Sequence, residues 1–262
     1  MPEIELRNVS LSFPRPGRDD RNTVYENFDI KIDKGSFTVL LGPSGCGKST
    51  FLNVINGLLR PTSADAVLID DADIREHPDL TRKMAYIFQG PRLLPWKTLR
   101  GNVEFGMRGL GVKPKSEWDG LIAKYFEMVG LTEYMDYYPH QVSGGMQQRA
   151  AIVRAWVNEP EILLMDEPFS HLDEITGAGL RRELIDLWTA EEERRTIVFV
   201  THNISEAVQL ASDIVVLTRA PSTICYRTEV DIPWPRESTS DDVFSLEKEL
   251  RRVFAEKAGI QV

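Results

Sequence analysis

The chain has 262 residues, of which 42% are hydrophobic and 27% are charged, an ordinary globular composition that excludes a disordered or low-complexity protein. Its formal net charge of −9 argues against sequence-independent nucleic-acid binding, which requires clustered Lys and Arg. The only two cysteines, Cys46 and Cys225, lie far apart and have no metal-ligand spacing, which excludes a disulfide framework and a zinc module.

Hydrophobic patterning predicts β-strands at residues 3–11, 28–32, 37–41, 66–69, 84–88, 162–166, 197–201, 214–217 and 224–232. The strands at 37–41 and 162–166 are almost entirely apolar, as in a parallel sheet that is buried on both faces. Turn-rich segments separate the first strands of the chain, so we expect these in an antiparallel layer beside the parallel core. The sequence therefore predicts an α/β fold.

Helical periodicity predicts helices at residues 48–59, 118–129, 145–158, 174–192, 204–211 and 243–254. The segment 91–141 has a mostly helical pattern, and we expect a helical subdomain at about residues 91–158, inserted into a domain that spans 1–240. The helix within 241–262 should pack on that domain through one apolar stripe. This stripe contains Val243, Leu246, Leu250, Val253 and Phe254.

The residues GPSGCGKS at 42–49 match the P-loop pattern G-x-x-x-x-G-K-[ST], and they lie between an apolar strand and a helix. Backbone N–H groups of such a loop bind phosphate oxygens, Lys48 supplies a positive charge, and the Ser49 hydroxyl can bind Mg²⁺. The sequence therefore predicts a nucleotide site. Its candidate residues are Gly42, Pro43, Ser44, Gly45, Cys46, Gly47, Lys48, Ser49 and Thr50.

Two carboxylates, Asp166 and Glu167, end the apolar strand at 162–166. Asp166 would hold Mg²⁺ through water, and Glu167 would act as the general base on the water that attacks the γ-phosphate. Taken alone, the two carboxylates could simply solvate the end of a strand. The P-loop elsewhere in the chain favours the catalytic interpretation.

The residues SGGMQQR at 143–149 begin a predicted helix and offer a second anion site, made of exposed N–H groups and the helix dipole. A serine with two glycines could by itself be an ordinary helix cap. However, the position of the motif favours a functional site, because it precedes the strand that ends at Asp166. The same chain places Gln89 and His202 directly after predicted strands, and Asp173 in the segment SHLD.

This ordered set of motifs resembles the ATP-binding cassette (ABC) ATPases over nearly the whole chain. The resemblance implies a P-loop nucleotide-binding domain that uses ATP and Mg²⁺. It also implies roles for residues outside the P-loop. These are Gln89 as the Q-loop glutamine and a metal contact, Ser143, Gly144 and Gly145 as the signature, Asp173 as the D-loop aspartate, and His202 as the switch histidine at the γ-phosphate.

The resemblance further implies that Phe13 stacks on adenine, with Tyr25 as the competing candidate and a core position as the alternative for Phe13. The sequence departs from the family pattern at three places. Its signature reads VSGGM rather than LSGGQ, Gly90 replaces a frequent acidic residue, and His171 lies in the D-loop where small residues are usual. The first two changes remove neither a phosphate donor nor a catalytic carboxylate, so we expect activity, whereas His171 bears on the contact between subunits.

In this family two copies enclose two ATP molecules, so the resemblance implies a homodimer that works with transmembrane permease subunits. The segments QGPRLLPW, SGGM and IPWPRESTSDD are similar to the nitrate, sulfonate, taurine and bicarbonate importer ATPases, which implies an extracytoplasmic solute-binding protein as an indirect partner. The cluster Leu93–Trp96 is typical of a docking groove, although Trp96 could instead pack inside the helical subdomain. The chain shows neither a signal-peptide pattern nor a spanning apolar run, so we expect it at the cytoplasmic face of the inner or plasma membrane, held by the permease.

Other functions fit the sequence less well. An ABC ATPase of DNA repair or translation would tend to carry coiled-coil insertions, tandem cassettes or basic arms, none of which the sequence shows. A non-catalytic ATP-sensing scaffold would be expected to lack Glu167 or His202, and both are present. A P-loop kinase or GTPase would leave the signature unexplained. The sequence does not identify the solute, because an ATPase subunit does not contact it.

Overall fold

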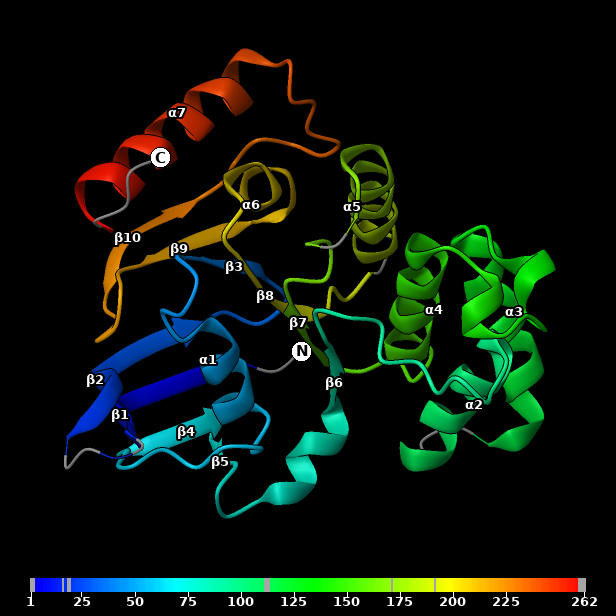
Figure 1. Cartoon of the computed structure of the whole chain (residues 1–262), viewed down its shortest axis with the longest axis horizontal. Coiled ribbons are helices and arrows are strands. Elements are labelled where there is room, and N and C mark those ends of the chain that lie inside the picture. Colours follow the sequence, from blue (N-terminus) through cyan, green and yellow to red (C-terminus); the bar gives the residue numbers. More distant parts are fainter. Residues whose placement is uncertain are drawn as a thin grey trace.

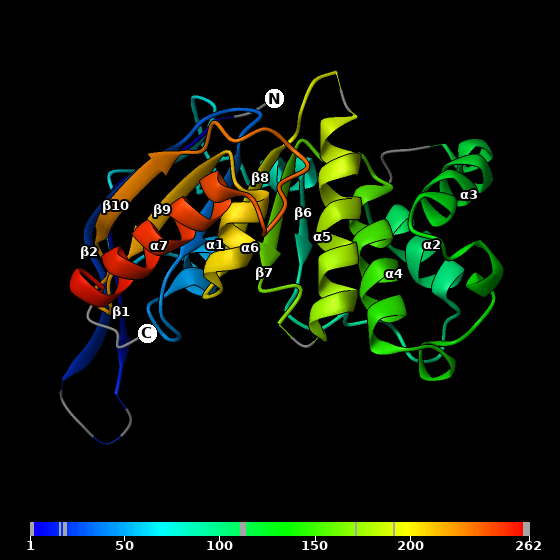
Figure 2. The same cartoon turned by 90° about the horizontal axis from the view of Figure 1, so that it is seen from above.

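The computed structural model describes residues 3–15, 17, 20–110, 114–170, 172–190 and 192–258. Two sheets and a separate group of helices make up this part of the chain (Figure 1). The smaller sheet and the helical group lie at opposite ends of the longest axis, and the larger sheet extends from beside the smaller sheet toward the helical group. Seen from above, the arrangement is the same (Figure 2).

The larger sheet has the strand order β10-β9-β3-β8-β7-β6, in which only the edge strand β10 is antiparallel to its neighbour. Its strands are β3 (Phe37–Leu41), β6 (Met84–Ile87), β7 (Ile162–Asp166), β8 (Thr196–Thr201), β9 (Asp213–Leu217) and β10 (Ile224–Glu229). All residues of β3, β8 and β9 are buried, because helices cover both faces of the sheet. The predicted α/β fold with a parallel core is confirmed.

The smaller sheet is antiparallel, with the order β2-β1-β4-β5, which confirms the predicted second layer. Its strands are β1 (Ile4–Pro14), β2 (Arg21–Ile32), β4 (Ala66–Ile69) and β5 (Ala72–Asp73). The prediction began the second strand at residue 28, which is too late. The strand begins at Arg21 because residues 21–25 pair with the end of β1, where Phe13 lies opposite Asn22. The two-residue strand β5 was not predicted.

Four helices flank the larger sheet. They are α1 (Lys48–Ile55), α5 (Glu174–Thr189), α6 (Ile204–Leu210) and α7 (Asp241–Glu256). The first ends before the predicted residue 59, because Gly57 adopts a left-handed conformation with φ of 67°, which ends a helix. Helix α7 packs beside α6 and buries Val243, Leu250, Val253 and Phe254.

The helical group contains α2 (Leu99–Leu110), α3 (Trp118–Met128) and α4 (Gly144–Trp156). The sequence analysis predicted helical structure for this region but did not identify α2 as a separate helix, since its sequence contains three glycines, which weaken the helical pattern. One of them is required by packing. A Cβ at Gly106 would come within 3.0 Å of the Arg154 side chain on α4. None of the helices in the described residues is long and apolar enough to cross a membrane.

Candidate nucleotide and hydrolysis site

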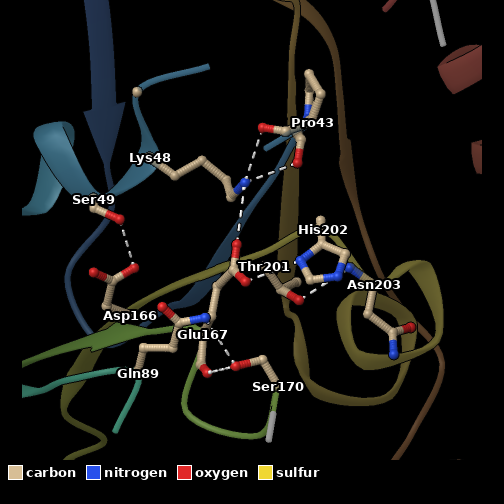
Figure 3. A network of polar contacts seen from close by, with 12 residues as sticks. Pro43, Lys48, Ser49, Gln89, Asp166, Glu167, Ser170, Thr201, His202 and Asn203 are labelled. Atoms are coloured by element: carbon tan, nitrogen blue, oxygen red, sulfur yellow. Dashed lines mark hydrogen bonds and ion pairs between the residues drawn. The ribbon is translucent and has the colours of Figure 1, made fainter. Parts of the chain in front are cut away.

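The P-loop connects β3 to α1 at the carboxyl end of the parallel strands. Gly45 and Gly47 adopt φ angles of 79° and 108°, which L side chains rarely allow. Lys48 is only 5% exposed, and its Nζ donates hydrogen bonds to the carbonyls of Gly42 (2.9 Å) and Pro43 (3.1 Å) (Figure 3). The lysine therefore folds back over its own loop, and its ammonium group lies where the loop turns.

Asp166 lies at the end of β7 and faces the first turn of α1. One carboxylate oxygen accepts a hydrogen bond from Ser49 Oγ at 2.8 Å, and the other accepts one from the Tyr86 hydroxyl at 3.2 Å. Burial raises the pKa of Asp166, against the lowering effect of these two donors. Tyr86 was not among the predicted site residues, because an aromatic residue within a strand is usually a core residue.

Glu167 links the P-loop lysine to the histidine that follows β8. Its Oε1 lies 3.3 Å from Lys48 Nζ, and its Oε2 lies 2.9 Å from His202 Nδ1 (Figure 3). The φ of Glu167 is 42°, a left-handed conformation that is unusual outside glycine and that occurs often at functional sites. The backbone holds this turn, since the Glu167 N–H donates to the Val200 carbonyl on β8 at 3.0 Å.

A buried polar network supports the turn that carries His202. The Thr201 hydroxyl donates to Glu206 Oε2 at 2.6 Å and accepts from the Asn203 N–H at 3.0 Å. The Asn203 side chain caps α6. Burial raises the pKa of Glu206, whose other oxygen lies 3.9 Å from Arg181. The position of His202 thus depends on residues that the sequence analysis did not single out.

Gln89 follows β6 and reaches the same turn. Its Nε2 donates to Ser170 Oγ at 3.2 Å, and Ser170 Oγ in turn donates to the Glu167 carbonyl at 3.0 Å (Figure 3). Ser170 was not predicted, since a serine beside the DE motif carries no distinctive spacing. The structure therefore brings Lys48, Asp166 and Glu167 together with Gln89 and His202.

The two candidates for adenine stacking have different surroundings. Tyr25 is 1% exposed, and its hydroxyl donates to the Gly47 carbonyl at 2.7 Å, so its ring has no free face for a base. Phe13 is 36% exposed, near the end of β1. Of the two, only Phe13 offers an accessible ring.

The signature and D-loop residues lie together but apart from the Lys48 group. Ser143 Oγ caps α4 by accepting from the Met146 N–H at 3.3 Å, and Asp173 caps α5 by accepting from the Thr176 N–H at 3.0 Å. Gly145 brings the two helix starts into contact, because a Cβ there would lie 2.7 Å from Thr176 Cγ2.

Both cartoons place α4 and α1 well apart, with the larger sheet between them (Figures 1 and 2). Within the described residues, the hydrogen bonds and ion pairs do not join Ser143 or Asp173 to Lys48 or Asp166. Gly144 shares the helix start with Ser143 and Gly145. The predicted D-loop departure at His171 lies outside the described residues.

The residues at the P-loop fit a nucleotide with Mg²⁺. Helix α1 has no side-chain cap, so its first N–H groups are not satisfied by a capping residue. Ser49 and Asp166 offer a hydroxyl and a carboxylate side by side, which are the hard oxygen ligands that Mg²⁺ prefers. Groups of three or more His, Cys, Asp or Glu suited to a metal do not occur in the described residues.

The segment Leu93–Trp96 lies between β6 and α2. Trp96 is 70% exposed, so the alternative that it packs inside the helical group is wrong. The backbone of this segment is fixed by Asn102, a fully buried side chain that accepts from the Leu94 N–H at 2.6 Å and donates to the Leu94 carbonyl at 3.2 Å. The segment therefore holds a large aromatic side chain in solvent on an ordered backbone.

Comparisons with known proteins agree with this geometry. A family model described as "ABC transporter" matches residues 25–170. The chain is 38% identical over 255 residues to an uncharacterized ABC transporter ATP-binding protein of Methanocaldococcus jannaschii, which covers 97% of this chain and 92% of the relative. It is 36% identical over 259 residues to an aliphatic sulfonates import ATP-binding protein of Bacillus cereus, and the alignment covers 98% of this chain and 97% of that protein. A solved dimeric ATP-binding cassette, bound to ADP and Pi in a post-hydrolysis state, is similar with a TM-score of 0.75 and 31% identity, over 88% of this chain and 100% of that one.

Proposed function

Because this chain belongs to the ABC transporter family, in which it is an ATP-hydrolysing subunit that uses ATP with Mg²⁺, we propose that it drives the import of a small anion. The observation that carries the catalytic part of the proposal is the chain of contacts from Lys48 through Glu167 to His202, beside the Ser49 and Asp166 pair. These groups occupy the carboxyl end of the parallel strands, where α/β sheets bind their ligands.

Residues 42–50 bind the phosphates of the nucleotide. The N–H groups of the loop and of the start of α1 hold the phosphate oxygens, and Lys48 places its charge at the β- and γ-phosphates. The exposed ring of Phe13 stacks on adenine. Ser49 and Asp166, with Gln89, hold Mg²⁺, which neutralises charge on the phosphates.

Hydrolysis uses Glu167 and His202. Glu167 accepts a proton from water as the water oxygen attacks the γ-phosphorus, and the bond from that phosphorus to the β–γ bridging oxygen breaks to give ADP and phosphate. His202 lies 2.9 Å from the same carboxylate, so it orients the base and can reach the γ-phosphate. Gln89 is connected to the Glu167 backbone through the Ser170 hydroxyl, which accepts from Gln89 and donates to the Glu167 carbonyl.

The complete site needs a second copy of the chain. The start of α4, with Ser143, Gly144 and Gly145, offers N–H groups and a positive helix end but lies away from the P-loop of its own chain. In a head-to-tail homodimer, each signature binds the γ-phosphate held by the partner. Asp173, at the neighbouring helix start, lies in the same interface. ATP then closes the dimer and hydrolysis reopens it.

Transport requires membrane subunits, which dock on the Leu93–Trp96 segment at Trp96, whose side chain is exposed. They hold the chain at the cytoplasmic face of the inner or plasma membrane. The similarity to the aliphatic sulfonates import protein supports an importer of sulfonate, taurine, nitrate or bicarbonate, with an extracytoplasmic solute-binding protein that delivers the solute. We further propose that residues 1–240 form the nucleotide-binding domain and that residues 241–262 are a C-terminal segment whose helix, α7 (Asp241–Glu256), is docked on it.

The test is ATP-dependent uptake in cells that carry or lack this chain. Uptake of a labelled aliphatic sulfonate, taurine, nitrate and bicarbonate is compared between the deletion strain, the strain restored with the wild-type chain, and one restored with Lys48→Ala. Import of one of these anions should be lost on deletion, return with wild type and stay absent with Lys48→Ala. Equal uptake of all four in every strain would contradict the proposed importer class.

A further inference from the structure

Two hydroxyl groups from distant parts of the sequence bond to consecutive carbonyls of the P-loop. The Ser222 hydroxyl donates to the Cys46 carbonyl, and the Tyr25 hydroxyl donates to the Gly47 carbonyl at 2.7 Å. Ser222 lies in the turn between β9 and β10, whereas Tyr25 lies on β2 of the other sheet. Both side chains are buried, with exposed fractions of 0% and 1%.

These two residues belong to one continuous support beneath the loop. The Ser222 N–H donates to the Val24 carbonyl at 2.8 Å, which joins the β9–β10 turn to β2 directly beside Tyr25. In Figure 1 the β9–β10 turn and β2 lie on the same side of the molecule. The end of β9 also meets the start of the loop, since a Cβ at Gly42 would lie 3.3 Å from the Cβ of Leu217.

The contact between this support and the loop is close. A Cβ at Gly47 would lie 2.4 Å from Val24 Cγ1 and 3.0 Å from the Tyr25 hydroxyl, so glycine is required there for packing as well as for its φ of 108°. Burial raises the pKa of Tyr25 well above its ordinary value. The phenol is therefore a protonated donor at any physiological pH.

We propose that Tyr25 and Ser222 are positioning residues that set the orientation of two peptide groups in the P-loop for phosphate binding. A peptide group is planar and trans, so its carbonyl and its N–H point in opposite directions. Holding the Cys46 carbonyl toward Ser222 turns the Gly47 N–H the other way. Holding the Gly47 carbonyl toward Tyr25 does the same for the Lys48 N–H. The two N–H groups are thus oriented before a nucleotide arrives, which lowers the ordering cost of binding.

This inference rests on the proposed role of residues 42–50 as the phosphate site, and it goes beyond it. The side chains involved do not touch the nucleotide. They act on backbone carbonyls of the loop, and the Tyr25 hydroxyl shares the Gly47 carbonyl with the Phe51 N–H, which donates to it at 2.8 Å in the first turn of α1. The second sheet and the β9–β10 turn therefore contribute to nucleotide affinity and not only to the fold.

The test compares Tyr25→Phe and Ser222→Ala with wild type in the full-length chain. Each variant removes one hydroxyl without adding bulk. Loss of one hydrogen bond of this kind should raise the Kd for MgADP and the KM for ATP about three- to tenfold in each variant. The kcat should stay close to wild type, because Glu167 and His202 are unchanged. Matched controls are Tyr226→Phe, which loses a hydroxyl bonded to Glu249, and Ser36→Ala, which loses one bonded to the Asp33 carbonyl.

Thermal unfolding separates positioning from folding. Without nucleotide, each variant should unfold as one transition. The increase in Tm on adding the same concentration of MgADP should be smaller in Tyr25→Phe and Ser222→Ala than in the controls, since stabilisation by a ligand grows with the logarithm of its concentration over Kd. A lower Tm with unchanged Kd and KM in either variant would overturn the assignment for that hydroxyl and leave it a purely structural role.

Lys48→Ala distinguishes failure of this inference from failure of the proposed site. If Lys48→Ala binds MgADP as wild type does, the proposed phosphate site itself is wrong. If Lys48→Ala loses binding while Tyr25→Phe and Ser222→Ala bind normally, the site stands and only the positioning roles fail.

Discussion

The nucleotide region and the helical group use opposite chemistry at their surfaces. Around the P-loop, charged groups are withdrawn from water and bonded to one another, as with Lys48 at 5% exposure between two carbonyls and Glu167. The helical group and the Leu93–Trp96 segment before it instead leave large apolar side chains in solvent, including Trp96 at 70% and Phe105 at 53% exposure. The first region is arranged for a small, highly charged ligand, and the second for a macromolecular surface.

The difference also shows how each region is held in place. The nucleotide region depends on side-chain hydrogen bonds between segments far apart in the sequence, such as Ser49 to Asp166 and Gln89 to Ser170. In the Leu93–Trp96 segment, the single buried amide of Asn102 fixes the backbone locally. A mutation in the first region should therefore affect chemistry, whereas one in the second should affect assembly.

The largest expected effect is on turnover. Glu167→Gln keeps the size of the side chain but removes the proposed general base, so kcat for ATP hydrolysis should fall by about 10²- to 10⁴-fold while ATP still binds. The control is Glu161→Gln, which lies before the opposite end of β7 and pairs with Lys83. Near-normal hydrolysis by Glu167→Gln would show that another group activates the water.

The second prediction tests whether the start of α4 belongs to the partner's site. Lys48→Ala and Ser143→Arg should each be inactive alone. Mixed dimers would carry one site with both defects and one intact site, so ATPase activity should return on mixing. The measurement is phosphate release as the ratio of the two variants is varied. If mixing never restores activity, each site is built within a single chain.

The third prediction concerns the exposed aromatic surface. Trp96→Ala should weaken assembly with the membrane subunits by about 2 kcal/mol or more, as for a tryptophan at the centre of an interface. Nucleotide affinity and Tm of the isolated chain should hardly change, because the side chain is exposed. Phe244→Ala is the matched control, because this aromatic side chain on α7 is also highly exposed, at 65%, but lies outside the helical group. Assembly of Trp96→Ala that is as tight as in wild type would contradict the docking role of this side chain.

The smallest expected effect is on the pH dependence of stability. Burial raises the pKa of Glu206, so the folded state disfavours the ionised carboxylate. The contribution of Glu206 to the free energy of unfolding therefore falls as pH rises from about 4.3, the pKa in the unfolded chain, through the raised pKa in the folded chain. Glu206→Gln removes that titration. Its stability relative to wild type, from urea unfolding at a series of pH values, should rise across this window. A difference that is constant with pH would contradict the prediction.

The fold was largely predictable from the sequence because its strands and P-loop have strong local signals. The apolar strands at 37–41 and 162–166 were predicted to the residue. Two errors came from local ambiguity. Glycines hid α2, and the pairing of Arg21 with Pro14 across the hairpin extended β2 beyond its apolar part. The division of the chain at residue 240 remains a prediction.

The candidate site was predictable only in part. Lys48, Asp166 and Glu167 belong to motifs with fixed spacing, and the structure brings them together. Tyr86 and Ser170 reach the same site from positions that carry no motif, since their roles arise from strand order and not from spacing. The roles of all of these residues in binding and hydrolysis remain predictions.

The dependence of the site on a second copy is the central claim, and the mass of Glu167→Gln in solution tests it most directly. With MgATP, the 29.8 kDa chain should be found at twice its mass, and with MgADP or no nucleotide it should be a monomer. The variant is used because slow hydrolysis keeps ATP in place. A variant that stays monomeric at saturating MgATP, beside a wild type whose turnover per subunit does not change on dilution, would contradict the shared site.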